Sequence, residues 1–112
     1  MWLVCGDRVL ASCEVATARR DRRKGLLGRD DFEGALLIEG TKSVHTLGMR
    51  FAIDVAHLDG EGVVLKVTTM PPWRVGAPVA AARSVVEAAA GSFERWGGLA
   101  VGDKLECRGG SE

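Results

Sequence analysis

Three side chains of the types used in nucleophilic catalysis lie close together in the middle of the chain. His45 and Thr46 are adjacent, and Asp54 follows within the segment SVHTLGMRFAIDVAHLDGEG. A hydroxyl nucleophile needs a base and an acid that orients the base, so these types match a small hydrolase. Adjacent residues of an extended segment point to opposite faces, which leaves His45 poorly placed to activate Thr46. We therefore favour a noncatalytic role and keep the hydrolase as the alternative.

Asp54 is the most informative of these residues. It lies between Ala52 and Ala56, on a strand face that carries no other charge before the next turn. Burial of an unpaired carboxylate would be costly, so we expect Arg50, Arg19 or backbone amides of the 45–49 loop to hold it as a structural brace. Convergent polar groups are also the usual sign of a ligand site. The alternative is a ligand-binding cleft lined by His45, Thr46, Arg50, Asp54 and Glu87.

The two histidines give no metal signal. His45 and His57 are 12 positions apart, and no cysteine lies within a few residues of either. Zinc ligands usually include pairs that are close in sequence. We expect no metal and no cofactor, and we interpret His57 as a half-buried residue satisfied within its strand.

The motif PPWR supplies a second candidate surface. Trp73 is expected to cover the edge of the core. In the alternative interpretation, Trp73 and Arg74 form an exposed protein-contact anchor, because both residue types are enriched among interface hot spots.

Composition excludes several classes of protein. The 112 residues fit one domain with one core, which we place at residues 1–108 with a loose tail at 109–112. Fifteen basic and 15 acidic residues leave no net charge, so no nucleic-acid partner is expected. The run RRDRRK, on a helix predicted over 18–27, is interpreted as a solvated face because Asp21 interrupts it and no aromatic residue is interleaved.

The expected location is the cytoplasm, without membrane attachment. No apolar run approaches the roughly 20 residues that span a bilayer. The N-terminal MWLVC becomes polar at Gly6, too soon for a signal peptide. The three cysteines are expected to be free thiols, because a two-residue turn at Gly6–Asp7 places Cys5 too far from Cys13 for a disulfide.

Alternation of apolar and polar residues predicts most of the elements that position these side chains. Strands are predicted over 8–16, 34–40, 51–58, 63–68 and 104–108, with a hairpin turn at 59–62. Ser92 is expected to cap one helical turn that ends at Trp96. The segment 78–90 is ambiguous: its alanines favour a helix, whereas Val85 and Val86 favour a strand.

Four segments, in this order, are similar to a known family: TARRDRRKGLLGR, VHTLGMRFAIDVAHLDGEGVVLKV, VVEAAAG and GLAVGDKLE. Over about residues 9–106 the chain resembles the uncharacterised protein family with domain of unknown function 192 (UPF0127-like). The resemblance implies a mainly β fold with short helices and some α+β character. It would be a compact β-sandwich or irregular barrel built on antiparallel hairpins, with 83–89 as a strand. The family brings no established activity.

These observations lead to one expectation of function. We expect a small noncatalytic binding or accessory module whose ligand is a small molecule or a protein segment. The alternative is a small hydrolase-like enzyme that uses His45, Thr46 and Asp54. The oligomeric state stays open.

Overall fold

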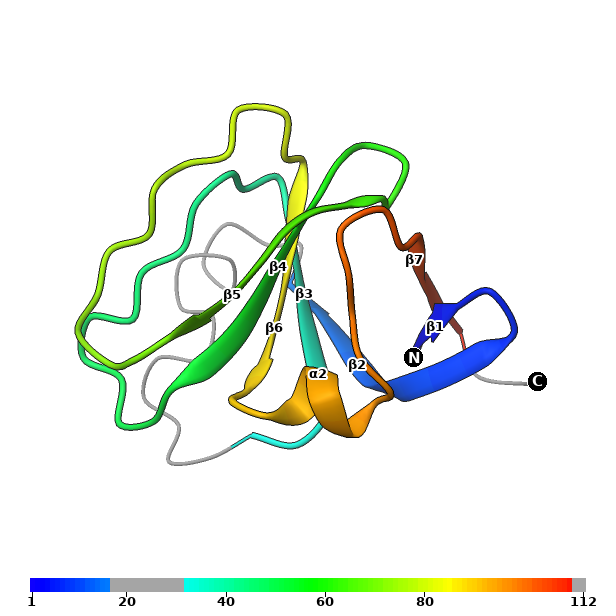
Figure 1. Ribbon diagram of the computed structural model, residues 1–112, viewed down its shortest axis with the longest axis horizontal. Helices are drawn as coiled ribbons and strands as arrows, with labels where there is room; N and C mark the ends of the chain where they lie inside the picture. The colour runs from blue at the N-terminus through cyan, green and yellow to red at the C-terminus, as the bar shows by residue number, and fades with distance from the viewer. Residues whose placement is uncertain (17–31, 110–112) are drawn as a thin grey trace.

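The computed structural model describes residues 1–16 and 32–109 (Figure 1). Its strands are β1 (Trp2–Cys5), β2 (Arg8–Ala16), β3 (Ala35–Glu39), β4 (Ile53–Leu58), β5 (Val64–Met70), β6 (Ser84–Ala89) and β7 (Leu105–Arg108). A short helix, α2 (Ser92–Arg95), follows β6. The described strands form one seven-stranded sheet in the order β5-β4-β6-β3-β2-β1-β7. Only β2 and β3 are parallel neighbours.

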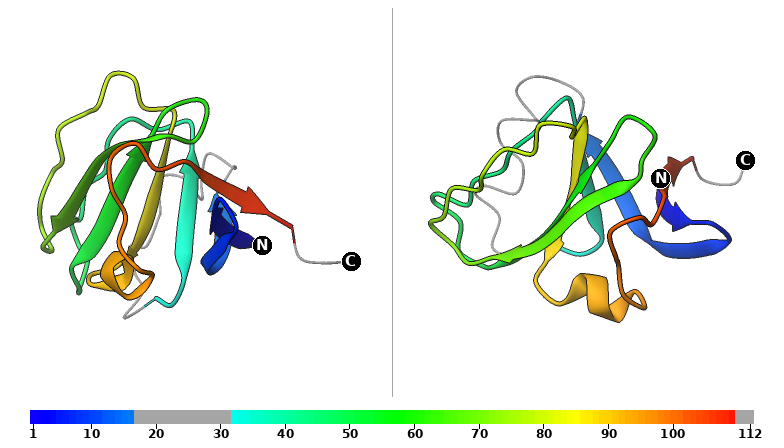
Figure 2. Two further views of the ribbon diagram at one scale, coloured as in Figure 1. Left: turned by 45° about the vertical axis from the view of Figure 1, so that its right-hand side comes forward. Right: turned by 45° about the horizontal axis from the view of Figure 1, so that its top comes forward.

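The prediction of a mainly β fold is confirmed. Figure 2 shows β5, β4, β6 and β3 side by side, while β1, β2 and β7 curve away from them. The sheet does not close on itself. None of the described helices is long and apolar enough to cross a bilayer.

The predicted hairpin at 59–62 is also confirmed. β4 and β5 are antiparallel, and the Asp59 carboxylate accepts the backbone N–H groups of Glu61 and Val63 across the turn. In this register His57 is paired with Lys66, next to a bulge at Leu58. The hairpin therefore places a histidine and a lysine on the same face of the sheet.

Within the ambiguous segment, Ser84–Ala89 forms a strand, as the family resemblance implies for 83–89. β6 lies between β4 and β3, and its Val85 and Val86 are fully buried, one on each face. A strand covered on both faces gains more from burying its β-branched residues than alanine gains from helix propensity. Tertiary packing thus overrides the local preference.

Two clusters of buried residues cover the two faces of the central strands. The first is closed by α2, β1 and β7, and contains Leu3, Cys13, Ala35, Ala56, Leu58, Val64, Val86, Ala88, Phe93 and Leu105. The second lies on the opposite face and contains Ala16, Leu36, Ile38, Met49, Ile53, Val55, Met70 and Val85. All six residues of β4 are buried as a result.

Some local predictions are corrected or untested. Gly91, not Ser92, is the N-cap of α2, and the Ser92 hydroxyl instead accepts a bond from Arg95. The first strand of the hairpin begins at Ile53, two residues later than predicted. The basic helix over 18–27 and the tail residues 110–112 lie outside the described residues.

Candidate functional site

Thr46 holds two loops together. Its hydroxyl donates to the carbonyl of Pro71 at 2.6 Å and accepts the N–H of Arg74 at 2.9 Å. Its backbone N–H donates to the backbone carbonyl of Arg74 at 2.7 Å, and its own carbonyl accepts the N–H of Trp73 at 2.8 Å. The side chain is fully buried. Its donor and acceptor are therefore both used by backbone groups, and the hydroxyl is not presented to a substrate.

The paired loops form a structure that we call the covering ribbon, residues 42–46 and 71–79. Besides the Thr46 bonds, it is held by an antiparallel bridge between His45 and Val75 and by a 2.8 Å bond from Gly76 N–H to the Val44 carbonyl. Figure 1 shows the two loops running alongside one another away from the sheet. His45 is exposed on this ribbon, and its Nδ1 accepts the N–H of Leu47 at 3.3 Å.

Asp54 is on the other side of the sheet from the ribbon. One carboxylate oxygen accepts the Thr69 hydroxyl at 2.8 Å; the other accepts the backbone N–H groups of Gly91 and Phe93 at 3.0 and 3.1 Å. Asp54 thus fixes the turn between β6 and α2. These three contacts replace Arg50 and the 45–49 loop as its expected partners, while Arg19 lies outside the described residues.

The predicted cleft that combined Asp54 with Glu87 is wrong. Asp54 is paired with Ala88, whereas Glu87 is paired with Val55. Because side chains alternate along a strand, the two carboxylates point to opposite faces of the sheet. Burial raises the pKa of Glu87 to about 7.

The remaining predicted residues lie at the surface. The Trp73 side chain is 65% exposed, so the expectation that it covers the core is wrong. Its backbone has a left-handed φ of +64°, which is unusual for a bulky residue. Arg74 and Arg50 are also exposed. Trp73 and Arg74 therefore have the exposure that a protein-contact anchor needs.

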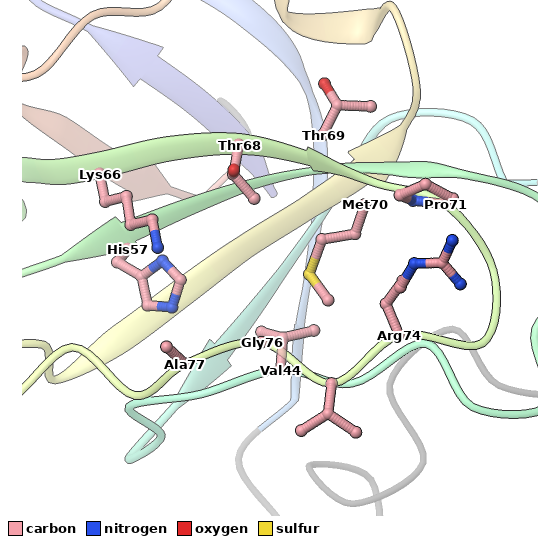
Figure 3. Close-up of a pocket in the computed structure, with 11 residues that line it drawn as sticks. Val44, His57, Lys66, Thr68, Thr69, Met70, Pro71, Arg74, Gly76 and Ala77 are labelled. Atoms are coloured by element: carbon pink, nitrogen blue, oxygen red, sulfur yellow. The ribbon is translucent and has the colours of Figure 1, made fainter.

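A pocket of about 240 Å³ lies between the covering ribbon and the sheet (Figure 3). β4 and β5 contribute His57, Lys66, Thr68 and Thr69, and the Thr69 hydroxyl is turned to Asp54 on the other face of the sheet. Met70 and the ribbon contribute the rest: Val44, Pro71, Arg74, Val75, Gly76 and Ala77. Of the residues predicted for a site, only Arg74 lines this pocket.

His57 is the unusual member of this pocket. It is only 4% exposed, and neither ring nitrogen has a hydrogen-bond partner among the described residues. The expectation of a histidine satisfied within its strand is therefore wrong. Burial, followed by the nearby charge of Lys66, lowers the pKa of His57 below its ordinary value of 6.5. A neutral imidazole offers one donor and one acceptor to whatever occupies the pocket.

Sequence reasoning missed His57 and Lys66 as a pair. The position of His57 in the sequence could have indicated its role. His57 continues the alternation of Ile53 and Val55, so its side chain faces the apolar side of the strand, where hydrogen-bond partners are scarce. Pairing with Lys66 depends on the register of the hairpin, which the neighbouring bulge sets. The covering ribbon, which encloses the pocket, arises from contacts between loops about 30 residues apart.

Comparison with known proteins supports the family resemblance. Residues 4–107 match the family model DUF192, described as "Uncharacterized ACR". The UPF0127 protein of Pyrococcus abyssi is 41% identical over 64 residues, which is 57% of this chain and 54% of that protein. Its counterpart from Pyrococcus furiosus is 42% identical over 64 residues, with the same coverage. The chain thus spans about half the length of the curated relatives it matches.

Two solved structures share the fold. A Novosphingobium aromaticivorans protein of unknown function has a TM-score of 0.75 and 20% identity, covering 88% of this chain and 76% of its own. A Sinorhizobium meliloti protein, described as a proposed transcription regulator, has a TM-score of 0.74 and 21% identity. The match covers 94% of this chain and 89% of that protein. At this identity the likeness concerns the fold alone.

Proposed function

The chain belongs to the DUF192 family, and we propose that it is a noncatalytic binding module that takes a small molecule into the pocket under the covering ribbon. His57 is the observation that carries the proposal. Its two buried ring nitrogens have no partner among the described residues, and such atoms cost roughly 1–3 kcal/mol each unless something else satisfies them. A fold retains such a cost where the polar atoms serve a function, and here they lie in the wall of a pocket.

The alternative, a hydrolase built on His45, Thr46 and Asp54, is not supported by the observed contacts. The Thr46 hydroxyl bonds to backbone groups of the covering ribbon. Both oxygens of Asp54 bond to Thr69 and the β6–α2 turn. A nucleophile, base and orienting acid would have to lie within hydrogen-bond reach of one another. A pocket with unsatisfied polar atoms fits a binder better.

A cytoplasmic setting remains part of the proposal. All three cysteines are free thiols, which suits a reducing compartment.

The second candidate ligand, besides a small molecule, is a protein segment. It is favoured by the exposed side chains of Leu47, Trp73 and Val75 on and beside the covering ribbon. Trp73→Ala should leave binding of a small molecule in the pocket unchanged, whereas it should weaken binding of a peptide.

The experiment uses the fact that the chain has only two histidines, one in the pocket and one outside it. A chemically mixed fragment library would be screened by thermal shift, and hits would be followed through the imidazole NMR signals of His57 and His45. Ligands of the pocket should move the His57 signals and leave those of His45 in place. If no fragment binds at millimolar concentration, or if hits move only His45, the proposal fails.

A pair of variants separates binding from folding. His57→Phe keeps a planar ring but removes both nitrogens, so it should raise the free energy of unfolding by about 2–6 kcal/mol and abolish binding. His45→Phe, at the exposed position, is the matched control and should change neither quantity by much. A His57→Phe variant that binds as well as the unaltered protein would contradict the proposal.

A further inference from the structure

We infer that the ligand of this pocket is a small organic carboxylate, with its anionic group held between Lys66 and His57 and its apolar body against Met70 and Val44. The inference rests on the proposed function, because it specifies the chemistry of the ligand for the same site.

The charges around the pocket favour an anion. Lys66 and Arg74 both line it, and none of its lining residues within the described part of the chain is acidic. Of the two buried carboxylates, Asp54 is on the opposite face of the sheet. Glu87 is on the pocket face but is not among the lining residues. A cation entering the pocket would therefore meet two like charges, whereas an anion would meet two opposite ones.

The position of Lys66 beside His57 suits a carboxylate in particular. The two residues are directly paired across β4 and β5, so their side chains leave the sheet side by side. Figure 3 shows the Lys66 ammonium close to the imidazole ring. A carboxylate between them accepts from the ammonium with one oxygen and from an imidazole N–H with the other. This arrangement satisfies a ring nitrogen that has no partner among the described residues.

The size of the pocket and its apolar wall limit the rest of the ligand. A volume of about 240 Å³ is below the roughly 300–1,000 Å³ of sites for drug-sized ligands, so a nucleotide does not fit well. Val44, Met70, Pro71, Val75 and Ala77 form the apolar wall. In Figure 3, Arg74 lies at the far end of the pocket from Lys66, with Met70 between them. The two cations are therefore separated, and they do not form the cluster of donors that binds a phosphate.

The experiment compares ligands of the same shape and different charge. Benzoate, benzamide and benzylamine, with butanoate, butanamide and butylamine as a smaller series, would be titrated into the full chain and followed through the His57 imidazole signals. Inorganic phosphate would be titrated separately. Each carboxylate should bind about tenfold more tightly than its amide, the effect of one charge-assisted bond, and the amines should bind least.

Variants then test the role of Lys66. Lys66→Met removes the charge, keeps much of the apolar stem, and changes an exposed residue, so the fold should be retained. It should weaken carboxylate binding about tenfold while leaving amide binding unchanged. Lys104→Met, at an exposed lysine outside the pocket, is the control and should have no effect.

The outcomes distinguish this inference from the proposed function. If amides or amines bind as tightly as carboxylates, or if Lys66→Met does not weaken carboxylate binding, the pocket is still a binding site but its ligand is not a carboxylate. Tighter binding of inorganic phosphate than of either carboxylate would also overturn the inference. If neither these compounds nor the fragment library bind, the proposed function itself fails.

Discussion

Replacing Asp54 should reveal how strongly one buried carboxylate holds the turn between β6 and α2. Asp54 accepts three hydrogen bonds: one from the Thr69 hydroxyl and two from the backbone N–H groups of Gly91 and Phe93. Asp54→Asn keeps the shape of the side chain and removes its charge. The asparagine can still direct its oxygen to the two amides and donate from its nitrogen to Thr69, because a hydroxyl accepts as well as donates.

The magnitude follows from this geometry. Two bonds to backbone amides change from charge-assisted to neutral, and each change costs about 1 kcal/mol. Asp54→Asn should therefore lower the free energy of unfolding by about 2 kcal/mol. Asp54→Ala leaves the amides of Gly91 and Phe93 without their acceptor, at roughly 1–3 kcal/mol each, so it should cost about 3–5 kcal/mol. The most specific part of the prediction is that Asp54→Ala lowers the free energy of unfolding more than Asp54→Asn does.

Urea unfolding, followed by tryptophan fluorescence and circular dichroism, provides the measurement. Asp7→Asn is a suitable control because Asp7 is exposed in the turn between β1 and β2. Amide hydrogen exchange at Gly91 and Phe93 should accelerate in both Asp54 variants and stay unchanged in the control. If Asp54→Asn differs from Asp7→Asn by less than about 0.5 kcal/mol, the turn does not depend on the carboxylate and the reasoning is refuted.

Three further predictions concern buried groups and a tight turn. The pKa of Glu87 is raised from 4.5 to about 7, so its contribution to stability is greatest below pH 4.5 and is lost as the pH rises towards and through 7. Glu87→Gln should therefore stabilise the protein by about 3 kcal/mol at pH 8 and hardly at all at pH 4.5; equal effects in urea unfolding at both pH values would contradict this. Gly62→Ala should destabilise the protein more than Gly98→Ala. Both glycines have a left-handed φ (+85° and +92°), but of the two only Gly62 has a carbonyl, that of Leu105, in the place where a Cβ would lie. Similar unfolding midpoints for the two variants would rule out the collision. Burial, followed by a hydrogen bond to Cys107, raises the pKa of Cys13 to about 12, so a thiol reagent at pH 8 should modify Cys13 only after unfolding; modification of native Cys13 at the rate of Cys107 would show that it is not protected.

The sequence predicted the strands well where the pattern is local. The β4–β5 hairpin follows from alternation on both sides of a polar, glycine-containing turn, and its Asp59 bonds across that turn. β6 could not be predicted from propensity, since it is a strand only because β4 and β3 cover its edges and both faces are buried. The family resemblance supplied that information in place of the missing long-range contacts.

The candidate site was less predictable, for a physical reason. Asp54 was correctly singled out as a buried charge, but its partners Gly91 and Phe93 are nearly 40 positions away and could not be inferred from spacing. His57 was misjudged because the sequence does not show whether a buried imidazole has a partner. Thr46 was grouped with a catalytic base, although its hydroxyl bonds to the backbone of the covering ribbon.

The order of strands in the sheet has a consequence for how the chain folds during synthesis. Among the described strands, the β1–β2, β2–β3 and β4–β5 pairs are consecutive in sequence, whereas β6 emerges from the ribosome well after both of its partners, β3 and β4. The longest interval separates β1 from its partner β7, because Leu3 pairs with Cys107 near the end of the described chain. Pairings of this range close large loops before they gain contacts, which makes folding slow. The nascent chain therefore exposes two hairpins with unpaired edges until β6 and β7 are made, and chaperone capture or misassembly is expected at that stage.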